Sequence, residues 1–235
     1  MNHTKDLIKK IPGMRGAYSR IRNLQGSQEI HPGPKSIIQN GHRAYVGSLW
    51  EQIGNLQFEF LVAEGLRPHH FFLDIACGCL RGGVHFIPFL DKGHYLGIEK
   101  ERSLIRRGII FELGIIQYLM KKPRLVVSHK FEFDQFDVQP DYALAQSLFT
   151  HLPESLINTC FKKLHQFIRK DGVFYATFFE TETDITNPSK PNDHGYFAYT
   201  QLQMKRFGNE NGWATEYIGN WNHPRKQVMV RYHPV

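Results

Sequence analysis

Residues 71–90 read FFLDIACGCLRGGVHFIPFL, and this stretch decides the fold of the chain. It begins as a buried apolar run, reaches a single acid at Asp74, and passes through small residues and glycines into a second apolar run. The first run predicts a strand, and the apolar spacing after Gly82 predicts a helix. A strand, an acid and a small-residue turn in that order indicate a ligand site at the start of a strand–helix unit.

The same alternation of strand and helix continues to the end of the chain. It predicts strands at 71–76, 94–99, 124–129, 141–147, 172–179, 214–219 and 226–232, and helices at 46–66, after Gly82, and at 103–120, 153–169 and 200–212. We therefore expect an α/β fold with a Rossmann-like, seven-stranded, mostly parallel sheet and helices on both faces. The segment NWNHPRK between the last two strands is too short for a crossover helix, so the last strand should be antiparallel.

Two further regions complete the expected organisation. Residues 1–70 should form an N-terminal helical extension or lid, and residues 71–235 the ligand-binding domain. A polar insert at about 180–200 follows the fifth strand and should form another part of the lid. The alternative for the insert is a disordered loop, given its segment TNPSKPND. Thr200 is expected to cap the helix that follows.

Composition excludes several classes of protein. The chain has 235 residues, of which 41% are hydrophobic and 22% charged, and this suits one large α/β domain. No apolar run is long enough to span a bilayer, and MNHTKDLIKKIPG lacks the apolar stretch of a signal peptide. Three cysteines are too few for a disulfide framework. We therefore expect a cytoplasmic protein without a membrane partner, while its oligomeric state cannot be read from the sequence.

The basic charge balance raises the question of an anionic partner. The formal net charge is +7 and the pI is near 9.3, which would suit RNA. The basic clusters at 9–10, 106–107 and 121–124 are scattered, and no RNA-binding signature such as the RNP1 pattern accompanies them. A solvated basic surface is the favoured interpretation, and nucleic acid is the less favoured partner.

Cys77 and Cys79 lie near several histidines and superficially resemble a metal cluster. However, C-x-C is not the spacing of closed zinc sites, and alternate residues of an extended segment point apart. We therefore expect no metal.

Polar residues follow three of the predicted parallel strands where those strands end. Asp74 ends the first strand, Glu99 the second, and Gln146 and Ser147 the fourth. In open α/β sheets, ligands bind beyond the carboxyl ends of the strands. These side chains should therefore converge at one sheet edge.

The turn after Asp74 excludes phosphate-bridged ligands. A dinucleotide needs G-x-G-x-x-G, and the chain has Ala76 and Arg81 at two of those positions. A P-loop needs a Lys and a Ser or Thr after its last glycine, and here Gly83 is followed by Val84. S-adenosylmethionine (SAM) fits better, because its ammonium and its ribose diol each need an acid, and its carboxylate needs backbone N–H groups.

At these residues the chain resembles the class I SAM-dependent methyltransferases. Besides residues 71–90, YLGIEKE at 95–101 looks like their second motif and FDVQPDYALAQSLFTHLPES at 136–155 like their fourth. More narrowly, ACGCLRGGVHFIPFL with a late WNHPRKQVMV is similar to bacterial small-molecule methyltransferases. The resemblance implies SAM as the cofactor, with contacts from Asp74, Ala76, Cys77, Gly78, Glu99, Lys100, Phe133, Gln146 and Ser147.

Two residues of the turn depart from the family pattern, and two of the contact residues carry an alternative. Ala76 replaces the family's first glycine, which is acceptable if its φ stays negative, and Leu80 replaces the third, which suggests that the turn leaves the cofactor before that point. Asp74 contacts the ligand or caps the next helix. Phe133 flanks the adenine or packs in the core.

The acceptor site rests on four candidates. His151 is the candidate general base, because a histidine at the pocket rim can be neutral near pH 7; alternatively it caps or packs against the helix starting near Pro153. Arg81 lies at a helix N-terminus, where the dipole disfavours a cation, so it should meet an anionic group of cofactor or substrate, or else lie on the surface. His194 and Tyr196 of the insert can stack on an acceptor and hydrogen-bond to it.

Three functions therefore compete. The favoured one is SAM-dependent methyl transfer to an oxygen or nitrogen atom of a small molecule. The second is methylation of tRNA or rRNA, motivated by the basic charge, although AQSLF replaces the (N/D)PP(Y/F) element of base amino-methyltransferases. The third is SAM binding without transfer. The sequence does not reveal the acceptor.

Overall fold

The apolar run at the start of residues 71–90 forms the central strand β1 (Phe72–Ile75), which is buried along its whole length. The structure, a computed structural model, describes residues 33–235. β1 pairs in parallel with β2 (Tyr95–Glu99) on one side and with β4 (Tyr142–Ala145) on the other. A continuous apolar run suits this position, because a central parallel strand is covered on both faces.

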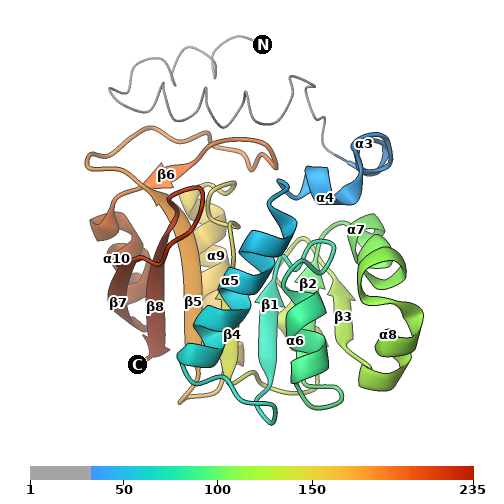
Figure 1. Ribbon diagram of the computed structural model, residues 1–235. Helices are drawn as coiled ribbons and strands as arrows, with labels where there is room; N and C mark the ends of the chain where they lie inside the picture. Colours follow the sequence, from blue (N-terminus) through green and yellow to red (C-terminus); the bar gives the residue numbers. More distant parts are fainter. Residues whose placement is uncertain (1–32) are drawn as a thin grey trace. The chain divides into compact units, whose positions relative to one another are not determined.

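The strands form one sheet in the order β3-β2-β1-β4-β5-β8-β7 (Figure 1). The remaining strands are β3 (Arg124–Val127), β5 (Val173–Glu180), β6 (Ala198–Tyr199), β7 (Trp213–Asn220) and β8 (Val228–Pro234). β8 runs antiparallel to both β5 and β7, and the other pairs are parallel. The predicted sheet is confirmed with one difference: the short strand β6 of the insert pairs with β5 and is the eighth strand.

Helices cover both faces of the sheet, as predicted (Figure 1). Side chains of β1 alternate between the two faces. Phe72 packs in a cluster with Leu61 and Phe86, whereas Leu73 belongs to the cluster of Phe161 and Phe207. The helices are α3 (Pro34–Asn40), α4 (His42–Tyr45), α5 (Trp50–Ala63), α6 (Gly83–Phe89), α7 (Arg102–Arg107), α8 (Ile115–Lys121), α9 (Glu154–Phe167) and α10 (Gln201–Glu210).

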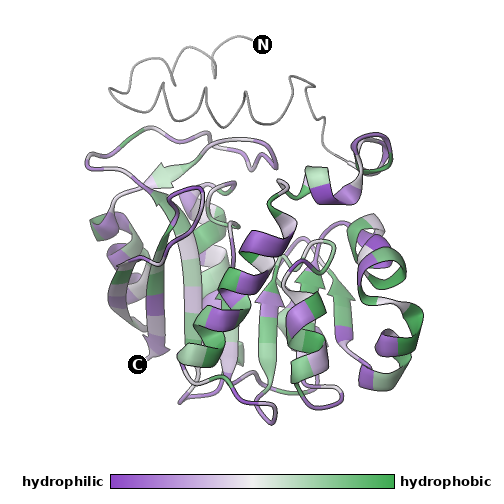
Figure 2. Cartoon of the chain, in the orientation of Figure 1, coloured by the Kyte–Doolittle hydropathy of each residue, from purple (hydrophilic) through white to green (hydrophobic). Residues whose placement is uncertain are grey.

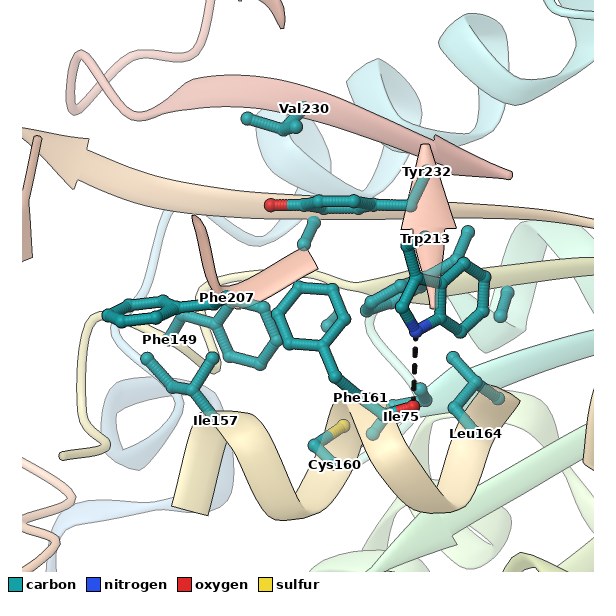
Figure 3. Close-up of a cluster of buried hydrophobic side chains, with 14 of the residues drawn as sticks. Ile75, Phe149, Ile157, Cys160, Phe161, Leu164, Phe207, Trp213, Val230 and Tyr232 are labelled. Atoms are coloured by element: carbon teal, nitrogen blue, oxygen red, sulfur yellow. Dashed lines mark hydrogen bonds between the residues drawn. The ribbon is translucent and has the colours of Figure 1, made fainter. Parts of the chain in front are cut away.

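The larger of the two cores is aromatic (Figure 3). Phe161, Trp213 and Tyr232 are almost completely buried there, and the Trp213 indole N–H donates a hydrogen bond to the Phe161 carbonyl at 3.2 Å. Each such side chain contributes roughly 1.5–3 kcal/mol by leaving water. Figure 2 shows that hydrophobic residues predominate on the central strands. This core fixes β5, β7 and β8 relative to α9, and thereby places the loops at the carboxyl edge.

The prediction of one long helix over 103–120 is wrong in one respect. α7 continues into a π-helical turn (Gly108–Leu113), and α8 begins only after Gly114. Gly114 has φ 84° and ψ 142°, a conformation that L-residues rarely adopt. The apolar spacing continued through the break, so periodicity alone could not reveal it.

The helix predicted over 46–66 begins later, at Trp50. Gly47, Ser48 and Leu49 have φ values of 92°, 55° and 50°, so the chain is left-handed at three successive residues before the helix starts. No helix between Gly33 and Val235 combines the length and the apolarity that crossing a bilayer requires.

The insert is folded onto the rest of the chain, so the disordered alternative is wrong for it. The Asn187 side chain exchanges two hydrogen bonds with the backbone of Ala198, at 2.8 and 3.1 Å. The Phe197 N–H donates to the Thr150 carbonyl at 3.1 Å, and the Phe197 side chain is fully buried. The expected Thr200 cap is confirmed as a capping box with Gln203.

Candidate functional site

The turn after β1 is tighter than the sequence suggested. Ala76, Gly78 and Leu80 have φ values of 62°, 56° and 66°, so the expectation of a negative φ at Ala76 is wrong. The Cys77 N–H donates to the Ile98 carbonyl at 3.1 Å, and the Leu80 N–H to the Cys77 carbonyl at 3.0 Å. These bonds hold two non-glycine residues left-handed, at a cost of about 1–3 kcal/mol each. Such stored strain is typical of ligand-binding turns.

Asp74 and Glu99 lie at the carboxyl ends of neighbouring strands, as predicted. Asp74 is 4% exposed and accepts a hydrogen bond from the Tyr95 hydroxyl at 2.7 Å. Glu99 is 6% exposed and accepts from the backbone N–H groups of Gly78 at 3.1 Å and Glu101 at 2.9 Å. A carboxylate offers about four acceptor sites, so both groups can accept further hydrogen bonds from a ligand.

Burial changes the proton affinity of both acids. It raises the pKa of Asp74 to about 6, although the Tyr95 hydroxyl and Arg81 oppose the shift. It also raises the pKa of Glu99 against the opposing N–H groups of Gly78 and Glu101. A cation or a pair of hydroxyl groups next to these acids would favour their ionised forms.

Gln146 and Ser147, the polar residues predicted at the end of β4, belong to a hydrogen-bond network that ties β4 to β5 and β8. Ser147 has φ 60°, and its N–H donates to Thr177 Oγ1 at 2.7 Å. Ser147 Oγ and Thr177 Oγ1 both donate to Gln227 Oε1, at 3.0 and 2.8 Å. Gln227 is only 2% exposed and directly precedes β8.

The His223 ring lies next to the Gln146 side chain. His223 Nδ1 accepts a hydrogen bond from the Arg225 N–H at 3.2 Å. Burial, together with Arg81 and Arg225, lowers the pKa of His223 to about 3, so the ring is neutral at pH 7. His223 Nε2 lies 3.1 Å from the amide nitrogen of Gln146, while Gln146 Oε1 is buried without a partner in the described part of the chain. The same amide nitrogen donates to Ser147 Oγ at 2.9 Å and to Gln227 Oε1 at 3.4 Å, so Gln146 belongs to the network of Ser147 and Gln227.

Three segments meet through Asp193 of the insert. The Tyr45 hydroxyl on α4 donates to Asp193 Oδ2 at 3.0 Å. The Lys100 ammonium, just after β2, forms an ion pair with the same carboxylate. The His194 ring lies edge-on to the Tyr45 ring, with centroids 5.0 Å apart. The structure thus directs Lys100, a predicted cofactor residue, to the insert, and ties the insert to helix α4.

His151 lies against the same segment. Its carbonyl accepts a hydrogen bond from the Asn192 N–H at 3.0 Å. Burial lowers the pKa of His151 to about 4 although Asp193 opposes the shift, and burial also lowers the pKa of His194. His151 Nδ1 is buried and has no partner among residues 33–235. The ring is therefore neutral at pH 7, as a general base must be.

The other predicted residues fall in different surroundings. Phe133 is 1% exposed and stacks with Phe167, so it belongs to the core, which was the alternative for it. The Cys77 side chain is buried in the apolar cluster beside β1, and burial raises the pKa of its thiol. Tyr196 stacks on Phe179 with centroids 4.9 Å apart. Arg81 is partly buried rather than a surface residue, and donates to backbone carbonyls.

The structure adds residues that were not singled out from the sequence: Tyr45, Asp193, His223, Arg225 and Gln227. Three of them lie in the segment WNHPRKQVMV, so a signal was present without an indication of which residues face the site. Within residues 33–235 no group of three or more His, Cys, Asp or Glu side chains is arranged to hold a metal ion.

Comparison with known proteins places this geometry in a structural class. No family model and no curated protein matches the sequence. Solved structures do match. Magnesium protoporphyrin IX methyltransferase (ChlM) of Synechocystis with bound SAM has a TM-score of 0.58 at 11% identity, over 95% of this chain and 92% of that one.

Two further structures give the same result. The CcbJ methyltransferase of Streptomyces caelestis has a TM-score of 0.60 at 12% identity, over 77% of this chain and 89% of that one. A TehB-like SAM-dependent methyltransferase of Corynebacterium glutamicum has a TM-score of 0.57 at 15% identity, over 93% and 100%. The sheet order, the strained turn after β1 and these similarities together show that the chain has the Rossmann-like fold of the SAM-dependent methyltransferases.

Proposed function

We propose that the protein is a SAM-dependent methyltransferase that transfers a methyl group to an oxygen or nitrogen atom of a small-molecule acceptor. One observation carries the proposal: two buried acids, Asp74 and Glu99, flank a strained small-residue turn at the carboxyl edge of a methyltransferase-type sheet. The solved ChlM structure of the same fold holds SAM, which supports the choice of cofactor.

The residues have separate tasks in binding. Asp74 would accept from the methionyl ammonium, and Glu99 from the ribose hydroxyl groups. The turn would contact the cofactor through the backbone of Ala76, Cys77 and Gly78, because the Cys77 thiol is buried in an apolar cluster. Gln146 and Ser147, in the network after β4, would line the site next to the sulfonium.

SAM supplies an activated methyl group, so the protein must chiefly hold the acceptor in line with the bond that breaks. Such alignment can contribute roughly 7–11 kcal/mol. A general base adds about 10²–10⁴-fold where the acceptor must lose a proton. We propose His151 for this role and His194 and Tyr196 for acceptor contacts. The pKa of about 4 makes His151 a weak base, so its effect should be at the low end of that range.

Titration with S-adenosylhomocysteine (SAH) tests the cofactor site. Asp74→Ala and Glu99→Ala should each weaken SAH binding at least tenfold, about 1.4 kcal/mol, because each removes a buried acceptor of ligand donors. Asp171→Ala, at an exposed acid far along the chain, is the matched control and should bind as the parent does. Parental affinity in both site variants would place the cofactor elsewhere.

Turnover of labelled SAM with a panel of acceptors separates the remaining alternatives. The proposal expects transfer to a small molecule, and His151→Ala should lower the rate about 10²-fold without changing SAH affinity. An unchanged rate would leave His151 a packing residue. Transfer to bulk tRNA with a steep salt dependence would favour the RNA alternative instead. Binding of SAH without transfer to any acceptor would favour a SAM-binding protein.

A further inference from the structure

Two arginines at the carboxyl edge have no acidic partner. Arg81 follows the turn after β1, and Arg225 lies in the loop between β7 and β8. Within residues 33–235, neither guanidinium forms an ion pair, and each lies close enough to influence the same ring, His223. Arg81 is also close enough to Arg225 for the two cations to repel each other.

The nearby carbonyl groups satisfy hydrogen bonds but do not neutralise the charges. Arg81 Nη1 donates to the carbonyls of Val46 and Ser48, both at 3.2 Å, and Arg225 Nη2 donates to the carbonyl of Gly47. The left-handed conformations at residues 47–49 accompany these contacts. Burial and the charge of Arg225 lower the pKa of Arg81 to about 10, although Asp74 opposes the shift.

Both guanidinium groups keep donors for a ligand. Each has five N–H groups in a planar fork, and the observed bonds use only Nη1 of Arg81 and Nη2 of Arg225. Among the described residues, the other nitrogens have no protein partner, and none of them is sealed from water. A carboxylate or phosphate matches this fork with two parallel hydrogen bonds.

The position of the pair points to the acceptor. Arg225 reaches the edge from the loop before β8, which pairs with β5, whereas Glu99 lies on the other side of β1 at the end of β2. The closest acid in electrostatic terms is Asp74, which the proposed function uses for the cofactor ammonium. SAM adds one positive charge of its own, so cofactor binding would leave the two arginines with still less compensation.

We infer that Arg81 and Arg225 together bind an anionic group, a carboxylate or a phosphate, of the methyl acceptor. This rests on the proposed function, because it names the class of molecule that enters the same site. The carbonyls of residues 46–48 hold the two forks in place and contribute no negative charge that would exclude the ligand. His223 accepts a hydrogen bond from the Arg225 backbone N–H.

Calorimetry with benzoate and with inorganic phosphate at low ionic strength tests the inference. Wild-type protein saturated with SAH should bind at least one of these probes. Arg81→Gln and Arg225→Gln should weaken that binding at least tenfold, and Arg225→Lys should retain part of it. The two Arg225 variants should keep SAH affinity within about threefold. Arg206→Gln, on α10 with Glu154 as its partner, is the control and should bind the probe as wild type does.

Four outcomes would overturn the inference: no probe bound by wild type with or without SAH, equal probe affinity in the glutamine variants, loss of SAH affinity in the Arg225 variants, or a probe bound by wild type without SAH but not with saturating SAH. The third and fourth would mean that the pair holds the cofactor's own carboxylate. Melting curves show whether each variant is folded. If a glutamine variant is unfolded, Arg225→Lys replaces it in the binding measurements. Probe binding without any SAH binding would instead refute the proposed function and leave the anion site standing.

An acceptor screen with labelled SAM gives an independent readout. Each carboxylic acid is paired with its primary amide, which has nearly the same shape without the charge. We expect turnover of the acid to exceed that of the amide at least tenfold in wild type and to approach it in Arg225→Gln. Equal turnover of acids and amides by wild-type protein would contradict the inference.

Discussion

At the scale of single residues, Asp74 combines burial with a role that requires charge. Its carboxyl is 4% exposed, and burial raises its pKa to about 6, above the ordinary value of 3.8. Between these values the native state binds more protons than the unfolded chain, so the contribution of Asp74 to stability falls as pH rises through that window. An ammonium ligand reverses the preference, because it is attracted only to the ionised form.

SAH affinity should therefore depend on pH. We expect wild-type affinity to be constant above pH 7 and to fall below about pH 6, approaching tenfold per pH unit, as Asp74 takes up a proton. Asp74→Asn should bind more weakly at pH 7, with a much flatter profile. Calorimetry from pH 5 to 8 measures both. A wild-type profile as flat as that of the variant would remove Asp74 from the ammonium site.

At the scale of elements, Gly114 divides what the apolar pattern presents as one helix. Its φ of 84° belongs to glycine, and a Cβ at this position would meet nothing within 4 Å. The restriction is therefore in the backbone and not in packing. The break allows α8 to start in a new direction after the π-helical turn of Gly108–Leu113.

Gly114→Ala distinguishes this geometry from a continuous helix by the sign of its effect. With the observed φ, the change should destabilise the protein by about 1–3 kcal/mol and lower Tm by roughly 2–4 °C for each kcal/mol. In a continuous helix, alanine would stabilise by up to about 1 kcal/mol. Ile116→Ala, at a side chain that is 77% exposed, is the control and should change stability by less than about 0.5 kcal/mol. Thermal melts decide.

At the scale of the whole described unit, Asp193 joins segments that are far apart in the chain. Tyr45 lies 148 residues before it and Lys100 lies 93 residues before it. Burial opposes ionisation of Asp193, but the Lys100 ammonium and the Tyr45 hydroxyl outweigh it and lower its pKa below 3.8. A lowered pKa gives stability that is present above pH 3.8 and is lost only as pH falls further. These contacts therefore hold throughout the neutral range.

We propose that this junction holds the insert over the carboxyl edge of the sheet, so that weakening it should speed the release of ligand. We expect Asp193→Asn to raise the dissociation rate of SAH about tenfold, because a charge-assisted hydrogen bond of about 1.5–3 kcal/mol is replaced by a neutral one. Asp184→Asn, in the same insert but away from Lys100, is the matched control. Displacement kinetics give the rates, and equal rates in the two variants would mean that the junction does not gate the site.

Much of the fold was predictable because its signals are local. The apolar run before Asp74 specifies a buried strand whether or not its neighbours are known, and Thr200 with Gln203 specifies a helix start three residues apart. The acids Asp74 and Glu99 were predictable for the same reason, since both end a recognisable strand. At Gly114 the local signal failed, because a glycine fits both a helix interior and a break.

The sequence by itself determined the succession of the main strands and helices along the chain and the two acids at the ends of β1 and β2, since these depend on residue spacing within one element. Only the tertiary structure decided that the charges of Arg81 and Arg225 influence each other, that His223 lies next to Gln146, and that Lys100 pairs with Asp193. These pairs lie tens to more than a hundred residues apart. Their approach is fixed by how helices and loops pack on the sheet, and no local pattern records that packing.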